Sequence, residues 1–185
     1  MIQASPSLSR RGLLAWLLAV SAPGWASLAR LPELADEWPA AQLRGSGRVD
    51  ALGLHICDIR LWVADDFSAE RFTQCPLALE IEYARALSGR RIAERAADEM
   101  QRVASMSSGQ RTVWLAAMKE AFPDVAKGER LTGLYRPNRG ATYFHDGRPC
   151  ADIEDPAFAA AFFAIWLSPK TSDPALRKAL LGGRS

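Results

Sequence analysis

His55 and Cys57 form the pair of residues whose chemistry is easiest to name. They lie two positions apart in a segment of strand-like composition, so their side chains point to the same face. A histidine and a cysteine on one face can bind a metal ion, or the imidazole can activate the thiol. The other histidine, His145, belongs to a different predicted strand. Two ligands do not make a metal site. We therefore predict no metal and no cofactor, and interpret the pair as an edge histidine beside a buried cysteine.

Charged residues on or beside the predicted strands are the second group of candidates: Arg48, Asp58, Arg60, Arg136 and Arg139. An arginine that reaches into a cleft would hold a ligand carboxylate through two parallel hydrogen bonds. The alternative is that these side chains form the solvated side of a sheet. Six aromatic residues at helical spacing predict a core, with the wall of a lipophilic pocket as the alternative: Trp114, Phe122, Phe158, Phe162, Phe163 and Trp166.

The elements that must position these side chains follow from periodicity and turn signals. Strands are predicted over 42–50, 54–63, 77–83, 131–136, 141–145 and 148–153. Helices are predicted over 92–103, 108–122, 156–167 and 174–181. Glu80 and Glu82 alternate with apolar residues and are expected to face solvent. The charged residues of the first helix are expected to form a solvated face: Glu94, Arg95, Asp98, Glu99 and Arg102. This order of elements predicts an α+β fold, with helices packed on one face of an antiparallel sheet.

The first 26 residues have the pattern of a secretory signal peptide. Arg10 and Arg11 precede an apolar run over 13–20, and small residues follow around Ala26. Cleavage after Ala26 is expected, with Ala29 as the alternative. An uncleaved membrane anchor is a further alternative, and it would be the only contact with a membrane. The paired arginines are typical of twin-arginine signals but are also common in ordinary ones. We expect export to the periplasm, a lead-in segment over 27–41 and one domain over 42–185.

Charge and cysteine content exclude several classes of protein. The chain has 23 Lys and Arg and 21 Asp and Glu, and removal of Arg10 and Arg11 with the signal leaves the two signs equal. Nucleic-acid binding favours a clustered basic excess, so no nucleic-acid partner is expected. The three cysteines, Cys57, Cys75 and Cys150, allow at most one internal disulfide, whose pairing the sequence leaves open. The oligomeric state is also left open.

Four segments resemble the chalcone isomerase superfamily in order and spacing. They are 45–62, 87–95, 131–147 and 162–176, and they include Gly45-Ser46-Gly47, Leu87-Ser88-Gly89 and Phe144-His145-Asp146-Gly147. The resemblance is strongest to the bacterial chalcone isomerase-like group, and it covers about residues 42–181. It implies an open-faced β-sandwich, in which helices cover a curved antiparallel sheet and leave an apolar cleft. Plant members of this superfamily cyclise a flavonoid precursor, whereas other members bind fatty acids.

The residues that carry catalysis in the plant enzymes are missing from this chain. The resemblance places the family's catalytic tyrosine at Ile92, its helix asparagine at Glu99 and its strand threonine near Cys57. The nearest counterpart of its strand arginine is Arg48, but the bacterial register places this position at Asp50. Isoleucine has no proton to donate, so the family's oxyanion chemistry is not expected here.

The resemblance therefore predicts a binding protein that does not catalyse a reaction. Its expected ligand is a small lipophilic or carboxylate-bearing molecule, such as a fatty acid or a phenolic compound. The alternatives are an isomerase or intramolecular lyase with a different residue set, and an envelope interaction protein without a ligand. No residue is assigned as catalytic. The candidates for the ligand pocket are Arg48, Cys57, Ile92, Glu99 and Tyr135.

Overall fold

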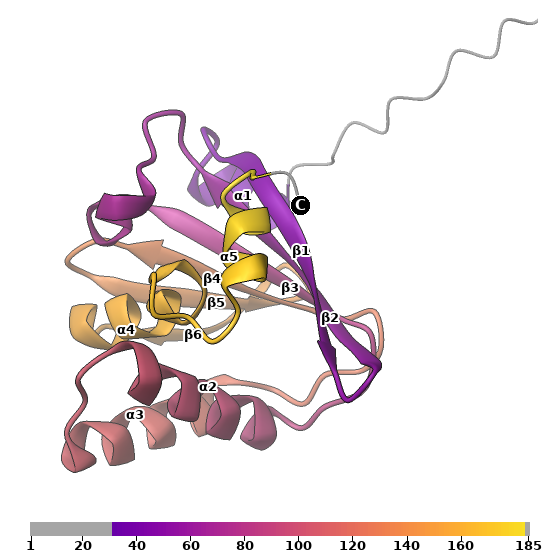
Figure 1. Cartoon of the computed structure of the whole chain (residues 1–185), viewed down its shortest axis with the longest axis vertical. Coiled ribbons are helices and arrows are strands. Elements are labelled where there is room, and N and C mark those ends of the chain that lie inside the picture. Colours follow the sequence, from indigo (N-terminus) through magenta and orange to yellow (C-terminus); the bar gives the residue numbers. More distant parts are fainter. Residues whose placement is uncertain (1–30, 184–185) are drawn as a thin grey trace, which may run out of the picture.

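Six antiparallel strands form one sheet in which every strand pairs with its neighbour in sequence (Figure 1). The computed structural model describes residues 31–183. The strands are β1 (Gln42–Ala51), β2 (Leu54–Val63), β3 (Leu77–Tyr83), β4 (Arg130–Arg136), β5 (Gly140–His145) and β6 (Arg148–Ile153). The helices are α1 (Pro32–Glu37), α2 (Gly89–Val103), α3 (Ser108–Ala121), α4 (Pro156–Leu167) and α5 (Pro174–Leu180), with a short 3₁₀ turn η1 (Ala69–Gln74). The prediction of an α+β fold, an open antiparallel sheet covered by helices, is confirmed. Within the described residues, no helix is long and apolar enough to cross a membrane.

The helix caps and turn residues predicted from the sequence are found at the expected positions. Ser107 caps α3 through a capping box with Gln110, and Asp155 and Asp173 accept backbone amides at the starts of α4 and α5. Leu52 and Gly53 have positive φ angles in the turn between β1 and β2. Asp146 and Gly147 do the same between β5 and β6, as a two-residue hairpin turn requires.

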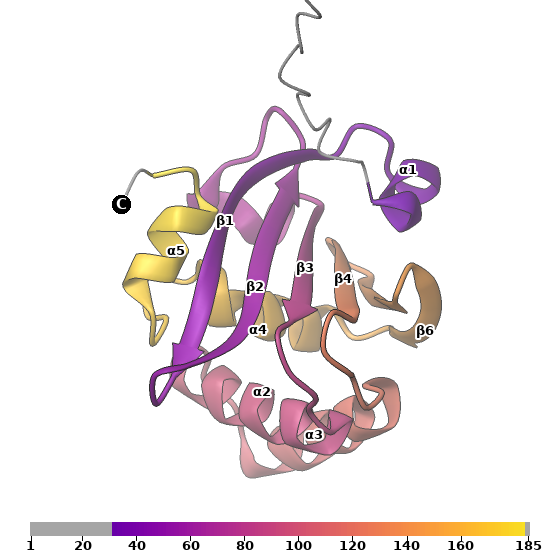
Figure 2. The same cartoon turned by 90° about the vertical axis from the view of Figure 1, so that its right-hand side faces the viewer.

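On the inner face of the sheet, two helices pack directly on the strands and a third packs mainly on other helices. Helix α4 packs on β4 and β5, and α5 packs along β1. Helix α2 has α3 and α4 as its main partners. Figure 2 shows α4 behind the strands, α5 beside β1, and α2 and α3 together at one end of the sheet.

Gly45 allows α5 to approach β1 directly. A Cβ atom at this position would lie 2.3 Å from the carbonyl oxygen of Ala179, which is shorter than any real contact. A glycine inside a strand often marks such a close approach of another backbone. Gly47 leaves room for the Leu176 side chain of α5, since a Cβ atom at Gly47 would lie 2.4 Å from Leu176 Cδ1. The two glycines thus bring α5 close to the edge of the sheet.

The outer face of the sheet is covered in part by α1, which the sequence did not predict. Leu34 of this helix joins Trp62, Ala78, Leu134 and Phe144 in a second apolar cluster. The cluster lies on the face opposite α4, because these strand residues alternate with those of the main core.

The expectation that Glu80 faces solvent is wrong. Its side chain is only 4% exposed, because α1 and neighbouring strands enclose it. Arg60 and Arg130 donate to Glu80 Oε1 at 2.9 and 3.4 Å, and the indole of Trp62 donates to Oε2 at 3.2 Å. A buried carboxylate is tolerated where such donors satisfy it. The residue type alone did not reveal these long-range partners.

A candidate ligand cleft

A cleft of about 1010 Å³ lies between the sheet and the helices. Its volume is at the upper end of the range for small-molecule sites, roughly 300–1,000 Å³. The sheet supplies one wall with side chains from β1 to β4: Val49, Cys57, Ile59, Ile81, Tyr83 and Leu131. The opposite wall comes from α2, α4 and the start of α5, and includes Ile92, Ala96, Phe162, Ile165, Trp166 and Leu176. Both walls are mainly apolar, so the cleft suits a lipophilic guest.

Helix α2 presents one stripe of side chains to the cleft. Ile92, Ala96 and Glu99 line it, and their spacing of four and three residues places them on one helical face. Ala93 and Met100 lie on the adjoining stripe and are buried in the main core. The small side chain of Ala96 leaves space in front of the helix. The candidate residues Ile92 and Glu99 are therefore brought together at this wall.

Arginines from the β3–α2 connection and the first turns of α2 surround the opening of the cleft. Arg85, Arg91 and Arg95 all line it and are exposed. Arg95 lies 2.7 Å from Glu99. Within residues 31–183, neither Arg85 nor Arg91 has an ion pair or a side-chain hydrogen bond. Two guanidinium groups are thus available to an anionic group at the rim.

The acidic residues at the same opening are already engaged. Asp50 is paired with Arg48 at 2.8 Å. Asp173 accepts the backbone amide of Leu176 at 2.8 Å as the cap of α5. Among the charged groups at the rim, Arg85 and Arg91 are thus the ones without a partner in the described residues, and an anionic group of a ligand would bind to them.

Glu99 is buried in the cleft wall, which corrects the expectation that the whole charged face of this helix is solvated. The residue is 5% exposed. Arg95 Nη2 lies 2.7 Å from Oε1 and Arg102 Nε lies 3.8 Å from Oε2. Neither oxygen accepts a hydrogen bond from the described residues. The two arginines balance the charge of a carboxylate that is almost fully enclosed.

Cys57 and Tyr83 are direct partners across β2 and β3 and line the cleft together. Burial, with a smaller contribution from the Asp58 charge, raises the pKa of the Cys57 thiol to about 12. Burial, with a smaller contribution from Cys57, also raises the pKa of Tyr83. Both groups are therefore protonated near neutral pH. The Tyr83 hydroxyl has no hydrogen-bond partner in the described part of the chain. Our sequence reasoning named Cys57 but not Tyr83, although the alternation of 77–83 placed Tyr83 inward.

The raised pKa of Cys57 predicts low reactivity toward alkylating reagents, because the thiolate is the nucleophile. Against a thiol of pKa 9.0, a pKa of about 12 lowers the thiolate fraction at pH 8 by about three orders of magnitude. We expect iodoacetamide to modify Cys57 after Cys75 and Cys150, as measured by peptide mass spectrometry over time. Fast modification of Cys57 at pH 8 would contradict this account of the site.

Arg48 and Tyr135, two of the predicted pocket residues, do not line the cleft. Strand alternation turns Arg48 to the outer side of β1, while its neighbour Val49 faces the cleft. Tyr135 lies deeper, where its ring packs on Phe163 at 5.3 Å and its hydroxyl donates to the Thr73 carbonyl at 2.8 Å. Our sequence reasoning placed both residues on the correct strands, but it determined neither that Arg48 faces outward nor which part of the inner face the cleft occupies.

The predicted aromatic set divides between core and cleft. Phe162 and Trp166 line the cleft, whereas the other four pack in the main core: Trp114, Phe122, Phe158 and Phe163. Of the His55 and Cys57 pair, only Cys57 reaches the cleft, and His55 lies 3.2 Å from Asp58. The three cysteines form no disulfide with one another.

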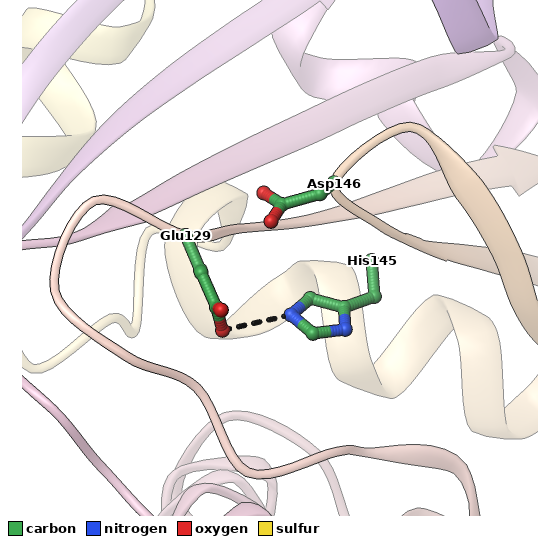
Figure 3. Close-up of side chains that lie close together, drawn as sticks. All are labelled: Glu129, His145 and Asp146. Carbon is green, nitrogen blue, oxygen red and sulfur yellow. Dashed lines mark hydrogen bonds and ion pairs between the residues drawn. The ribbon is translucent and has the colours of Figure 1, made fainter.

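A cluster away from the cleft brings Glu129, His145 and Asp146 together, with possible ligand atoms within 4.8 Å of one another (Figure 3). Its carboxylates already have structural partners. Glu129 accepts from the Ala126 amide at 2.8 Å and lies 3.0 Å from the His145 ring. Asp146 accepts from the Arg130 amide at 2.8 Å. These bonds fit a role in holding the turns beside β4 and β5, so we do not assign a metal to the cluster.

The fold of this chain is similar to that of a solved fatty-acid binding protein of Arabidopsis thaliana. The two structures align with a TM-score of 0.57 over 77% of this chain and 87% of the plant protein, at 10% sequence identity. At this identity the likeness shows a common fold. No curated protein sequence matches the chain.

The sequence pattern of one family covers most of the domain. Residues 66–182 match the family described as chalcone isomerase-like. The match extends from the segment before η1 to the end of α5, and it includes the α2 wall and the arginine rim of the cleft. The chain therefore belongs to the chalcone isomerase-like family.

Proposed function

We propose that this protein binds an amphipathic carboxylate, such as a fatty acid, and releases it unchanged. The chain of the ligand lies in the apolar cleft, and its carboxylate lies at the rim beside Arg85 and Arg91. The observation that carries the proposal is the combination of mainly apolar walls with two rim guanidinium groups that lack partners among residues 31–183. Arginine is well suited to a carboxylate, because its planar guanidinium can donate two parallel hydrogen bonds. The fatty-acid binding function of the plant structure supports the same class of ligand.

The chemistry of the cleft favours binding over turnover. The resemblance to the superfamily places its catalytic tyrosine at Ile92, and isoleucine cannot transfer a proton. Cys57 and Tyr83 have raised pKa values and stay protonated near neutral pH. No histidine lines the described cleft. We also propose that residues 1–26 direct export and that the protein acts in the periplasm, as in the bacterial group that it resembles.

Removal of the rim charges tests the proposal. The variant Arg85→Met/Arg91→Met should bind dodecanoic acid about 10- to 30-fold more weakly than the wild type in titration calorimetry. Each exposed ion pair contributes up to about 1 kcal/mol, and 1.4 kcal/mol corresponds to a factor of ten. Dodecanol has no charge, so its affinity should change little.

The matched control is Arg90→Met. Arg90 neighbours Arg91 on α2 but is paired with Glu94 at 2.9 Å and does not line the cleft. This variant should bind dodecanoic acid like the wild type. Failure of the delipidated wild-type protein to bind either compound would overturn the proposed function and favour a protein that interacts without a ligand.

A further inference from the structure

The turn between β1 and β2 exposes two leucines. Leu52 is fully exposed and Leu54 is 51% exposed, and the other residues of the segment 51–54 are exposed as well. The segment contains no charged side chain, and we call it the apolar tip. In the described part of the chain, Val113 is the one other large apolar residue with comparable exposure. Two of the three such side chains therefore lie in a single turn.

Leu52 is also unfavourable for the backbone conformation of this turn. Its φ angle is +52°, in the left-handed region that favours Gly, Asn and Asp because a Cβ atom crowds the next carbonyl oxygen. The other two non-glycine residues with positive φ in the range 31–183 are Asn138 and Asp146, which are of the favoured types. A leucine here strains the backbone and exposes apolar surface to water. The stability of the fold therefore does not account for it.

The apolar tip lies at the opening of the ligand cleft. Ala51 lines the cleft, and Arg91 lines it from the first turn of α2. The Ala84 amide donates to the Ile56 carbonyl at 2.9 Å, so the chain runs beside the base of the hairpin up to Arg85. Figure 2 shows the β1–β2 turn at the end of the sheet where α2 lies. An apolar projection and two guanidinium groups therefore surround one opening.

The acidic residues around the apolar tip are held by other groups or lie elsewhere. Asp50, directly before the tip, pairs with Arg48 at 2.8 Å. Asp58 lies further along β2 and faces the outer side of the sheet, because its neighbour Cys57 faces the cleft. Asp173 caps α5. Apolar side chains accompanied by arginines without partners suit the surface of an anionic bilayer.

We propose that the apolar tip and the rim arginines dock this protein on an anionic phospholipid bilayer. Leu52 and Leu54 enter the boundary between the headgroups and the acyl chains, while Arg85 and Arg91 bind lipid phosphates. Docking turns the opening of the cleft toward the lipids, so that an amphipathic ligand can pass between bilayer and cleft. This passage rests on the proposed function, whereas the docking does not. Our sequence reasoning expected a membrane contact only through an uncleaved N-terminal segment.

Co-sedimentation with vesicles tests the docking. The delipidated protein should bind vesicles of phosphatidylcholine and phosphatidylglycerol, and bind them less well at high salt, which screens exposed charges. The variant Leu52→Asn/Leu54→Thr should bind them about tenfold more weakly or less, because it removes two apolar side chains. The variant Arg85→Met/Arg91→Met should lose about tenfold and most of the salt dependence.

The single variant Leu52→Asn separates docking from folding and from ligand binding. Asparagine favours the left-handed conformation, so the melting temperature should stay the same or rise. Leu52 does not line the cleft, so the variant should bind dodecanoic acid like the wild type while it binds vesicles more weakly. The matched control is Val113→Asn, which removes an exposed apolar side chain from α3 and should bind vesicles like the wild type.

A fluorescent label at the apolar tip keeps the test decisive if residues 1–26 remain attached and bind vesicles by themselves. Leu52→Cys and Val113→Cys are made in a chain that carries Cys75→Ser and Cys150→Ser, and are labelled with a nitrobenzoxadiazole. Cys57 is buried and its pKa is raised to about 12, so it stays unlabelled. Anionic vesicles should shift the emission of the label at position 52 to shorter wavelength and leave that at position 113 unchanged.

Three outcomes would count against docking or against the proposed function. If the label at position 52 stays in water and the tip variant sediments like the wild type, the docking is refuted, and titration with dodecanoic acid still decides the proposed function. If the tip variant instead dissociates a dimer in analytical ultracentrifugation, the tip joins two copies of this chain, which also refutes the docking. If vesicles bind and dodecanoic acid does not, the docking stands and the proposed function fails.

Discussion

Replacement of Ala96 by tryptophan should reduce the affinity for a long-chain fatty acid by about 60-fold or more. Ala96 lies in the middle of the α2 stripe that faces the cleft. An indole at this position takes space that would otherwise hold several methylene groups of the ligand. Each buried methylene contributes about 0.8 kcal/mol, so the displacement of three costs about 2.4 kcal/mol. Titration calorimetry with hexadecanoic acid measures the loss.

The control for this variant is Ala116→Trp, which adds the same side chain to an exposed position of α3. It should bind hexadecanoic acid like the wild type. Far-ultraviolet circular dichroism and thermal unfolding establish that both variants are folded. Equal affinities of a folded Ala96→Trp variant and the wild type would show that the ligand binds somewhere other than this cleft.

Replacement of Phe163 by alanine should destabilise the protein by about 3–5 kcal/mol, the usual cost of such a truncation in a core. Phe163 is fully buried on α4 and packs against Tyr135 at 5.3 Å and Phe162 at 5.4 Å. Gly133 leaves room for its ring, since a Cβ there would lie 3.2 Å from the ring of Phe163. For a chain of this size, each kcal/mol lowers the melting temperature by roughly 2–4 °C. We therefore expect a decrease of about 6–20 °C in thermal unfolding.

The variant Trp166→Ala, on the same helix, should affect ligand binding strongly and the stability of the fold only weakly. Trp166 is half-buried and lines the cleft, so its removal should weaken ligand binding more than it weakens the fold. Thermal unfolding and calorimetry of both variants separate the two roles. A larger stability loss for Trp166→Ala than for Phe163→Ala would contradict the division of the aromatic residues between core and cleft.

The elements of this fold were predictable because their signals are local. Alternation identified β3, and caps fixed the starts of α3, α4 and α5 at Ser107, Asp155 and Asp173. Each signal depends on hydrogen bonds or side-chain directions within a few residues. The helix α1 was missed because its six residues, the first of them a proline, are too few to show a clear periodicity. Its stability comes from packing on the outer face of the sheet.

The candidate site was predicted only in part. Cys57, Ile92 and Glu99 were named from the sequence, and all three line the cleft. Tyr83 and the rim arginines Arg85 and Arg91 were not named, because nothing in their local sequence distinguishes them from ordinary strand and surface residues. Arg48 lies on the correct strand but on its outer side, and Tyr135 lies on the correct strand but packs in the core away from the cleft, whose position strand alternation alone does not give.

By itself, the sequence determined the order of most strands and helices and the α+β class. These properties reside in residue type and short-range spacing. Only the tertiary structure decided that Glu80 and Glu99 are buried, and that the guanidinium groups of Arg85 and Arg91 flank an apolar cleft. Burial and charge pairing depend on contacts between segments far apart in the chain. The packing of α1 on the outer face encloses Glu80, and the packing of α5 on β1 and of α2 on α4 shapes the cleft on the inner face.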